Sequence, residues 1–259
     1  MASLSGSIPQ TAMSIRCVKD DNSYTPEQPV DAQPCPYLPT VKDYDGNEYN
    51  TVQIGTQCWM KENLKTTRFS NGTAITLGTS ASTSVAYRYN PNNDANRVAA
   101  YGYLYNWKAV MNGGSSSSTV PSGRQGICPF GWHVPSDAEW TMLTNYVGGV
   151  SAYKCNSNSS YIAKALASTT GWSSSSTGAC YVGNDQSTNN ATGFSAMPAG
   201  EYDGGNFSFG GSANFWTATR NNSYSDRAYY RSLGGSTAVV TASAHGVSNE
   251  GYSVRCLRD

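Results

Sequence analysis

The sequence has little charge and no excess of either sign. Only 13% of its 259 residues are charged, and 17 Lys and Arg balance 17 Asp and Glu. A protein that binds nucleic acid needs a basic surface to neutralise phosphates, and anionic membranes attract basic segments in the same way. The neutral balance therefore argues against nucleic acid and against an electrostatic membrane surface as partners.

Long apolar runs are missing as well. No stretch approaches the roughly 18 apolar residues of a membrane-spanning helix, so we expect no membrane insertion. Residues 1–20 also lack the apolar core of a secretory signal peptide. An extracellular protein of this sequence has either lost a leader or leaves the cell by another route, such as the release of phage particles by lysis.

Signatures of metal, cofactor and catalytic chemistry are absent too. The cysteines form no C-x-x-C, and neither His133 nor His245 lies near a cysteine pair, so no zinc site is expected. The acidic stretch 43–48 lacks the spacing of an EF-hand and is typical of an Asp-Gly hairpin turn. No Gly-rich phosphate loop follows a strand, and no nucleophile–base pair is recognisable. We therefore predict no cofactor, metal or catalytic residue, with His133 a structural histidine and His245 lacking an obvious acidic partner.

Seven cysteines are present, and they point to disulfides and to an oxidising compartment. The sequence alone does not fix their pairing. Cys35 and Cys58 bracket the first predicted hairpin, and Cys155 and Cys180 bracket one polar segment. Cys128 and Cys256 are left to join the start of the main helix to the last strand. The pairs that follow are Cys35–Cys58, Cys155–Cys180 and Cys128–Cys256, with Cys17 left over. The alternative is that several are reduced, buried thiols.

The composition favours a β-rich extracellular protein with long loops, because Gly, Tyr, Ser, Thr and Asn are abundant. We expect an N-terminal arm and Pro-rich linker over residues 1–40 and one domain over residues 41–259. Residues 14–20, SIRCVKD, resemble the last seven residues, SVRCLRD. This repeat suggests that residues 14–20 are the tail of a preceding domain of the same kind, and chance similarity is the alternative.

The main helix is predicted to follow CPFGWHVPSDAEW, residues 128–140. Ser136 and Glu139 form a capping box, and Gly148-Gly149 ends the helix. Its apolar face is predicted to comprise Trp140, Met142, Leu143, Tyr146 and Val147. Closing antiparallel strands are predicted at 213–219, 228–233, 238–240 and 252–257. In the last of these, Tyr252, Val254 and Cys256 are expected to face inward, with the alternate residues facing the other way.

Six motifs in order carry a family resemblance. They begin at residues 45, 59, 101, 128, 193 and 252 and read DGNEYNTVQIG, WMKENLKTT, YGYLYNW, CPFGWHVPSDAEW, GFSAMPAG and YSVRCLRD. Over residues 41–259 the chain resembles the Fibrobacter succinogenes major paralogous domain, which is common in secreted and surface proteins of gut Bacteroidetes. The resemblance implies an α+β, C-type-lectin-like fold akin to that of formylglycine-generating enzymes. Such a fold has a small twisted antiparallel sheet, two short helices and long irregular loops.

A second resemblance concerns the polar segment before the C-terminus. From about residue 220 to 246 the chain is similar to the variable proteins of diversity-generating retroelements, in which mutation rewrites ligand-facing codons on a lectin-like scaffold. Within the segment 220–249, this similarity and the Tyr- and Arg-rich composition imply the following ligand-binding residues: Arg220, Tyr224, Asp226, Arg227, Ser232, Ser236, Thr237, Thr241, Ser243 and His245. The alternative is an ordinary polar surface.

Two functional hypotheses follow. The first is a non-enzymatic extracellular binding or adhesion domain, on a cell surface or a phage tail, that contacts a protein or glycan. The second is an enzyme or glycan-processing domain on a scaffold like that of formylglycine-generating enzymes. Those enzymes need a cysteine pair, and the cysteines here are expected to be in disulfides. The Trp-Asn-Asp and Glu-Pro-Asn signatures of calcium-dependent lectins are also absent, so the first hypothesis is favoured.

Overall fold

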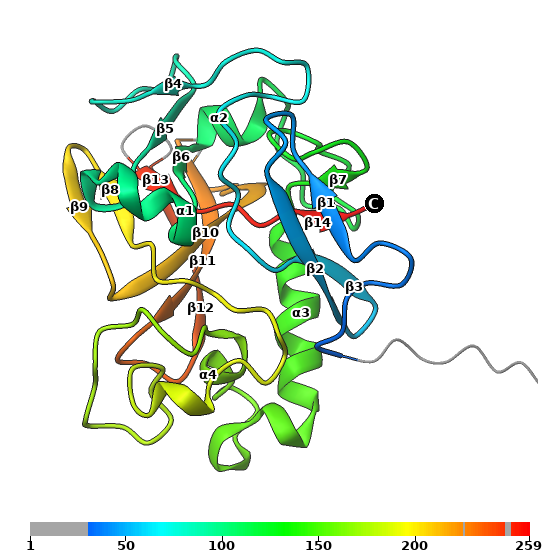
Figure 1. Cartoon of the computed structure of the whole chain (residues 1–259), viewed down its shortest axis with the longest axis vertical. Coiled ribbons are helices and arrows are strands. Elements are labelled where there is room, and N and C mark those ends of the chain that lie inside the picture. Colours follow the sequence, from blue (N-terminus) through cyan, green and yellow to red (C-terminus); the bar gives the residue numbers. More distant parts are fainter. Residues whose placement is uncertain (1–30, 225, 247–249) are drawn as a thin grey trace, which may run out of the picture.

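The computed structural model describes residues 31–224, 226–246 and 250–259. Residues 1–30 of the predicted N-terminal arm, with the repeat at 14–20 and Cys17, lie outside these ranges, as do residues 247–249 of the predicted ligand-binding segment. Residues 31–40 of that arm are described and are tied to the domain by the Cys35–Cys58 disulfide. Within them the protein is α+β, with more strand than helix, as expected (Figure 1). No helix among these residues is long and apolar enough to cross a membrane.

Three sheets form the framework, and all but one of their strand pairs are antiparallel. The five-stranded sheet contains, in spatial order, β1 (Thr40–Lys42), β2 (Glu48–Ile54), β3 (Gln57–Met60), β14 (Leu257–Arg258) and β7 (Trp132–His133). The six-stranded sheet contains β4 (Thr76–Leu77), β5 (Tyr87–Tyr89), β6 (Leu104–Asn106), β13 (Glu250–Tyr252), β8 (Glu201–Asp203) and β9 (Asn206–Ser208). The three-stranded sheet contains β10 (Ser212–Arg220), β11 (Arg227–Gly234) and β12 (Val240–Gly246).

Four α-helices accompany the sheets in the described ranges, and short 3₁₀ turns interrupt the loops. The α-helices are α1 (Val98–Tyr101), α2 (Trp107–Met111), α3 (Asp137–Gly149) and α4 (Ala163–Leu166). The 3₁₀ turns are Pro91–Asn93, Ala95–Arg97, Ser151–Tyr153, Cys155–Ser157 and Gln186–Thr188. The expectation of one small sheet with two short helices was therefore too simple. The strand predicted at 238–240 was also misplaced, since β12 begins at Val240.

The main helix is capped as predicted. Ser136 Oγ accepts from the Glu139 backbone N–H, and a Glu139 carboxylate oxygen accepts from the Ser136 N–H. Trp140, Leu143 and Val147 are buried. The prediction was wrong for the other two positions, because Met142 is 42% exposed and Tyr146 is 40% exposed. The buried face is a narrow i, i+3, i+7 stripe that leaves both residues on the flank.

Helix α3 lies beside the three-stranded sheet (Figure 1). Trp140 packs in an aromatic cluster with Trp59, Phe194 and Phe215, with ring centroids 4.9–5.6 Å from its own. A buried arginine on β11, Arg231, ties the sheet to the helix. Its Nε donates to Asp137 Oδ1 at 2.8 Å and its Nη2 to Thr141 Oγ1 at 2.7 Å. One face of the sheet is therefore covered by α3.

The last seven residues close the core. Tyr252, Val254 and Cys256 lie in the core as expected. The alternate residues face a second cluster and not solvent, because Ser253 and Arg255 are completely buried and Leu257 is 3% exposed. The segment is not one strand, since β13 ends at residue 252 and β14 begins at 257. Residues 253–257 pass between the sheets and are buried on both sides, whereas Arg258 and Asp259 at the end are exposed.

Three disulfides join Cys35–Cys58, Cys128–Cys256 and Cys155–Cys180. This is the pairing expected from the sequence. The second bond spans 128 residues and fixes the closing segment to the loop before α3. Because disulfides persist in oxidising environments, these bonds indicate a secreted or otherwise non-cytoplasmic protein.

Candidate functional site

Half of the predicted ligand-binding residues share one face of the three-stranded sheet. Cross-strand partners in an antiparallel sheet point to the same side. The register pairs Tyr230 with Ser243 and Ser232 with Thr241, and it sets Ala228 opposite both Arg220 and His245. We call the following set the hairpin face: Arg220, Tyr230, Ser232, Thr241, Ser243 and His245. The opposite side carries Arg231 and packs on α3, so the hairpin face is the side turned away from that helix.

Carboxylates border the hairpin face. Glu201, on β8, accepts from Asn214 Nδ2 at 3.1 Å, and Glu250, on β13, lies 3.4 Å from His245 Nδ1. The expectation that His245 lacks an acidic partner was therefore wrong. Burial and then the charge of Asp203 raise the pKa values of both glutamates. Both carboxyl groups therefore hold a proton more readily than a free glutamate does.

Aromatic rings support the same face. The Tyr230 ring lies 4.7 Å from Tyr252 and 5.3 Å from His245, measured between ring centroids. Tyr230 is half-buried, and Tyr252 and Trp216 beneath it are completely buried. The hairpin face therefore combines the rigid, half-buried ring of Tyr230 with the short hydroxyl side chains beside it.

A pocket opens where the hairpin face ends near α2. It has a volume of about 530 Å³, and we call it the end pocket. Its lining comprises Thr83, Trp107, Lys108, Met111, Gly113, Gly114, Arg220 and Asp226. The Arg220 guanidinium lies 4.5 Å from the centroid of the Trp107 ring. Two of the predicted residues, Arg220 and Asp226, therefore line the same pocket as residues that lie more than 100 positions earlier in the sequence.

The remaining predicted residues lie elsewhere. Tyr224, on the loop after β10, and Arg227, the first residue of β11, stack on each other, with 4.7 Å between the guanidinium carbon and the ring centroid. Ser236 and Thr237 line a separate pocket of about 310 Å³ at the opposite end of the hairpin, beside Cys180. The structure therefore does not gather all ten residues into one surface.

Sequence reasoning missed Trp107, Lys108, Glu201 and Glu250. Each lies in a motif or strand that gives no local sign of function. Lys108 and Trp107 are on α2, where lysine is an ordinary exposed residue and tryptophan an ordinary buried one. Only the contacts of β10 with α2 and of β13 with β8 bring these side chains to the hairpin face.

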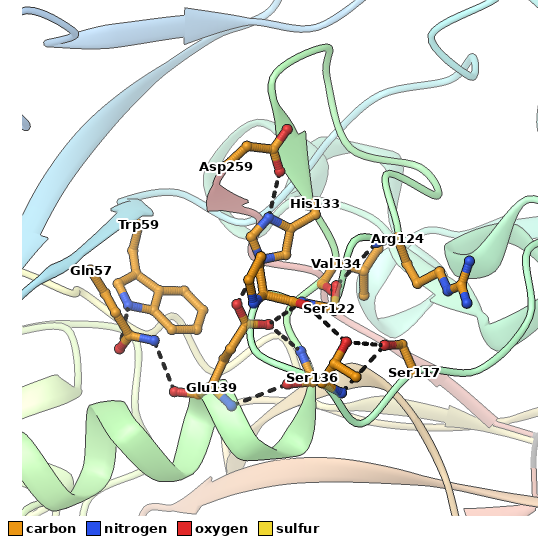
Figure 2. A network of polar contacts seen from close by, with 12 residues as sticks. Gln57, Trp59, Ser117, Ser122, Arg124, His133, Val134, Ser136, Glu139 and Asp259 are labelled. Carbon is orange, nitrogen blue, oxygen red and sulfur yellow. Dashed lines mark hydrogen bonds and ion pairs between the residues drawn. The ribbon is translucent and has the colours of Figure 1, made fainter.

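His133 occupies a separate, buried network (Figure 2). Its Nδ1 is 2.7 Å from Asp259 Oδ1, and its Nε2 is 2.9 Å from Glu139 Oε1. Ionised carboxylates only accept, so this arrangement favours the protonated ring, in which both nitrogens donate. Burial lowers the pKa of His133, but the hydrogen bonds and charges of Glu139 and Asp259 outweigh it and raise the pKa. A ring in this state has no lone pair free to take a proton, which agrees with a structural role.

A groove of about 570 Å³ borders this network between α3, β3 and the end of the chain. Val120 and Met142 on its rim are 51% and 42% exposed, and Tyr37 is 98% exposed. The groove holds none of the residues predicted to bind ligand. Across the described ranges, no group of three or more His, Cys, Asp and Glu side chains is arranged to hold a metal ion.

Comparison with known proteins gave one match. A family model described as the Fibrobacter succinogenes major domain matches residues 52–258. The match runs from within β2 to β14 and includes both the hairpin face and the end pocket. Searches of curated proteins and of solved structures found no match.

Proposed function

The chain belongs to the Fibrobacter succinogenes major domain family, and from this premise we propose that it is a non-enzymatic binding domain. Its ligand is a protein or a glycan on a cell surface, and this ligand contacts the hairpin face and the end pocket. One observation carries the proposal. The strand register gathers Arg220, Ser232, Thr241, Ser243 and His245 on the side of the sheet that α3 does not cover.

The chemistry of the hairpin face supports binding. Tyrosine supplies rigid contact area at a low entropy cost, and serine and threonine supply adaptable hydrogen bonds, as in antibody paratopes. Thr241 and His245 are exposed, and Ser232 and Ser243 are half-buried. Short side chains on a rigid sheet can be exchanged without disturbing the core, so the same scaffold could serve different ligands.

The proposal extends to the scaffold and its diversification. We take the three sheets with α3 as a C-type-lectin-like arrangement, of the kind the family resemblance implies, on a surface protein or a phage tail. Residues 220–246 are then the segment rewritten by a retroelement. Sequencing the locus from several isolates tests this, because diversification predicts substitutions confined to 220–246 with a near-copy template nearby. Even variation along the chain would contradict it.

A paired substitution tests the binding surface. Thr241→Lys adds a bulky charge to the hairpin face, on an edge strand that tolerates lysine. Asn145→Lys is the matched control, because Asn145 is exposed on α3 on the other side of the sheet. Both variants and the wild-type chain are applied to a glycan array and to a panel of purified bacterial surface proteins.

We expect Thr241→Lys to weaken every wild-type interaction at least tenfold, a change of about 1.4 kcal/mol. Asn145→Lys should bind as the wild type does, and both variants should keep the wild-type melting temperature. Equal binding by the two variants would place the ligand elsewhere on the molecule.

A further inference from the structure

The end pocket carries a positive bias in an otherwise neutral protein. Two of its lining side chains are cations, Lys108 and Arg220, and one is a carboxylate, Asp226. Its volume of about 530 Å³ lies within the range of small-ligand sites, roughly 300–1,000 Å³. The pocket is therefore suited to a small ligand with an anionic group.

Arg220 is held in place before any ligand arrives. Its guanidinium lies 4.5 Å from the centroid of the Trp107 ring, and its backbone N–H donates to Ser116 Oγ at 2.9 Å. Trp107 is itself fixed, because its Nε1–H donates to the Thr217 carbonyl at 3.0 Å. A guanidinium fixed in this way loses little conformational entropy on binding, and its planar N–H groups match the two oxygens of a carboxylate.

The stacking of Arg220 on Trp107 excludes one common way in which proteins bind sugars, namely packing of the sugar ring on an exposed aromatic side chain. Trp107 is 5% exposed, and Arg220 lies over its ring. The ring is thus not an open platform for the apolar face of a neutral sugar. A ligand in the end pocket has to be recognised through its polar groups.

Asp226 restricts which anions fit. Its carboxylate can accept hydrogen bonds from hydroxyl groups, and it repels a second negative charge on the ligand. A compact dianion such as sulfate gains from the two cations but is opposed by Asp226. A monoanion that also carries hydroxyls satisfies all three side chains.

We propose that the end pocket binds the carboxylate of an acidic sugar, of the uronic or sialic acid type. Arg220 and Lys108 hold the carboxylate, and Asp226 accepts from a hydroxyl of the same sugar. This assignment rests on the proposed binding function and narrows its ligand to anionic glycans.

The test compares acids with their neutral esters. Galacturonate oligosaccharides and sialyllactose, each with its methyl ester, are titrated calorimetrically into the full chain. Inorganic sulfate is titrated as a simple anion. We expect at least one acid to bind at least tenfold more tightly than its ester, and to bind more weakly as the salt concentration rises. Sulfate should bind more weakly than that acid.

Three variants assign the roles. Lys108→Gln removes a charge and should weaken binding of the acid several-fold. Arg220→Lys keeps the charge but loses the planar fork, and it should cost at least tenfold. Asp226→Asn should improve sulfate binding and reduce the preference for the hydroxylated acid. Lys42→Gln is the control, because Lys42 lies on β1 in an exposed ion pair with Glu48.

Several results would overturn the assignment. They are equal affinity for acid and ester, no binding of any acid at millimolar concentration, sulfate binding as tight as acid binding, or wild-type affinity in Lys108→Gln. The acidic-sugar assignment can fail while the proposed binding function stands. If Thr241→Lys abolishes binding to a protein or a neutral glycan while Lys108→Gln leaves it intact, the binding domain stands and only the acidic-sugar assignment falls.

Discussion

Replacing Arg255 by methionine should destabilise the protein severely, although the new side chain is apolar and of similar length. The Arg255 guanidinium is completely buried and contacts no carboxylate among its hydrogen-bond partners. Its Nε donates to Asn63 Oδ1 at 2.8 Å, and its Nη2 donates to the Ser195 carbonyl at 2.8 Å. Its Nη1 donates to the carbonyls of Met60 and Phe194.

The magnitude follows from the four acceptors that methionine would leave without this donor. A buried acceptor without a partner costs about 1–3 kcal/mol, so four cost about 4 kcal/mol at the least. Burial lowers the pKa of Arg255 to about 9, which shows that the buried charge itself carries a desolvation cost. Removing that charge offsets part of the loss. We therefore expect a net loss of about 3 kcal/mol, because the unpaired acceptors outweigh the relief of the buried charge.

Urea unfolding followed by tryptophan fluorescence measures this loss, with the disulfides intact and verified by mass spectrometry. Arg255→Lys is the matched variant, because it keeps the charge but has fewer donors, so it should lose less than Arg255→Met does. A domain is typically stable by about 5–15 kcal/mol, so the methionine variant should still be measurable. A loss below about 1 kcal/mol would show that the four acceptors find water or other donors, and it would refute this reasoning.

Three further predictions concern the main helix and its neighbours. Ser136→Ala removes the cap and should cost about 1 kcal/mol, measured by the urea midpoint, and an unchanged midpoint would argue against the capping box. Leu143→Ala opens a cavity at a completely buried site and should cost about 2–5 kcal/mol, whereas Met142→Ala, on the exposed flank, should cost much less. His133 has a pKa raised above 6.5, so its contribution to stability is complete below pH 6.5 and is lost as pH rises through the raised value. Unfolding at several pH values should show this decline, and His133→Asn should flatten it.

The main helix could be predicted from the sequence because its signals lie within a few residues of one another. The cap joins Ser136 and Glu139, three positions apart, and the buried stripe repeats with the helical period. The hairpin at Asp45-Gly46 is equally local, since Gly46 has φ +81° and the register pairs Lys42 with Glu48. The errors at Met142 and Tyr146 arose because the width of a buried stripe depends on what packs against it.

The disulfides and the family were also accessible from the sequence. Bracketing of short segments suggested two of the pairs, and the third followed by elimination. The ordered motifs suggested the family that the match over residues 52–258 shows. The residues predicted to bind ligand were all taken from one continuous segment. That segment folds back on itself as β11 and β12, so its residues line separate pockets and not one surface.

What the sequence by itself determined is therefore local: the helix with its cap, the first hairpin and the residues available for disulfides. Tertiary structure alone decided that Arg220 meets Trp107, that His133 meets Asp259, and that residues 253–257 are buried on both sides. The physical reason is distance along the chain. His133 and Asp259 are 126 positions apart, and Trp107 and Thr217 are 110 apart. Periodicity reports only which side of an element is apolar, and the partner on that side is set by how all the elements pack together.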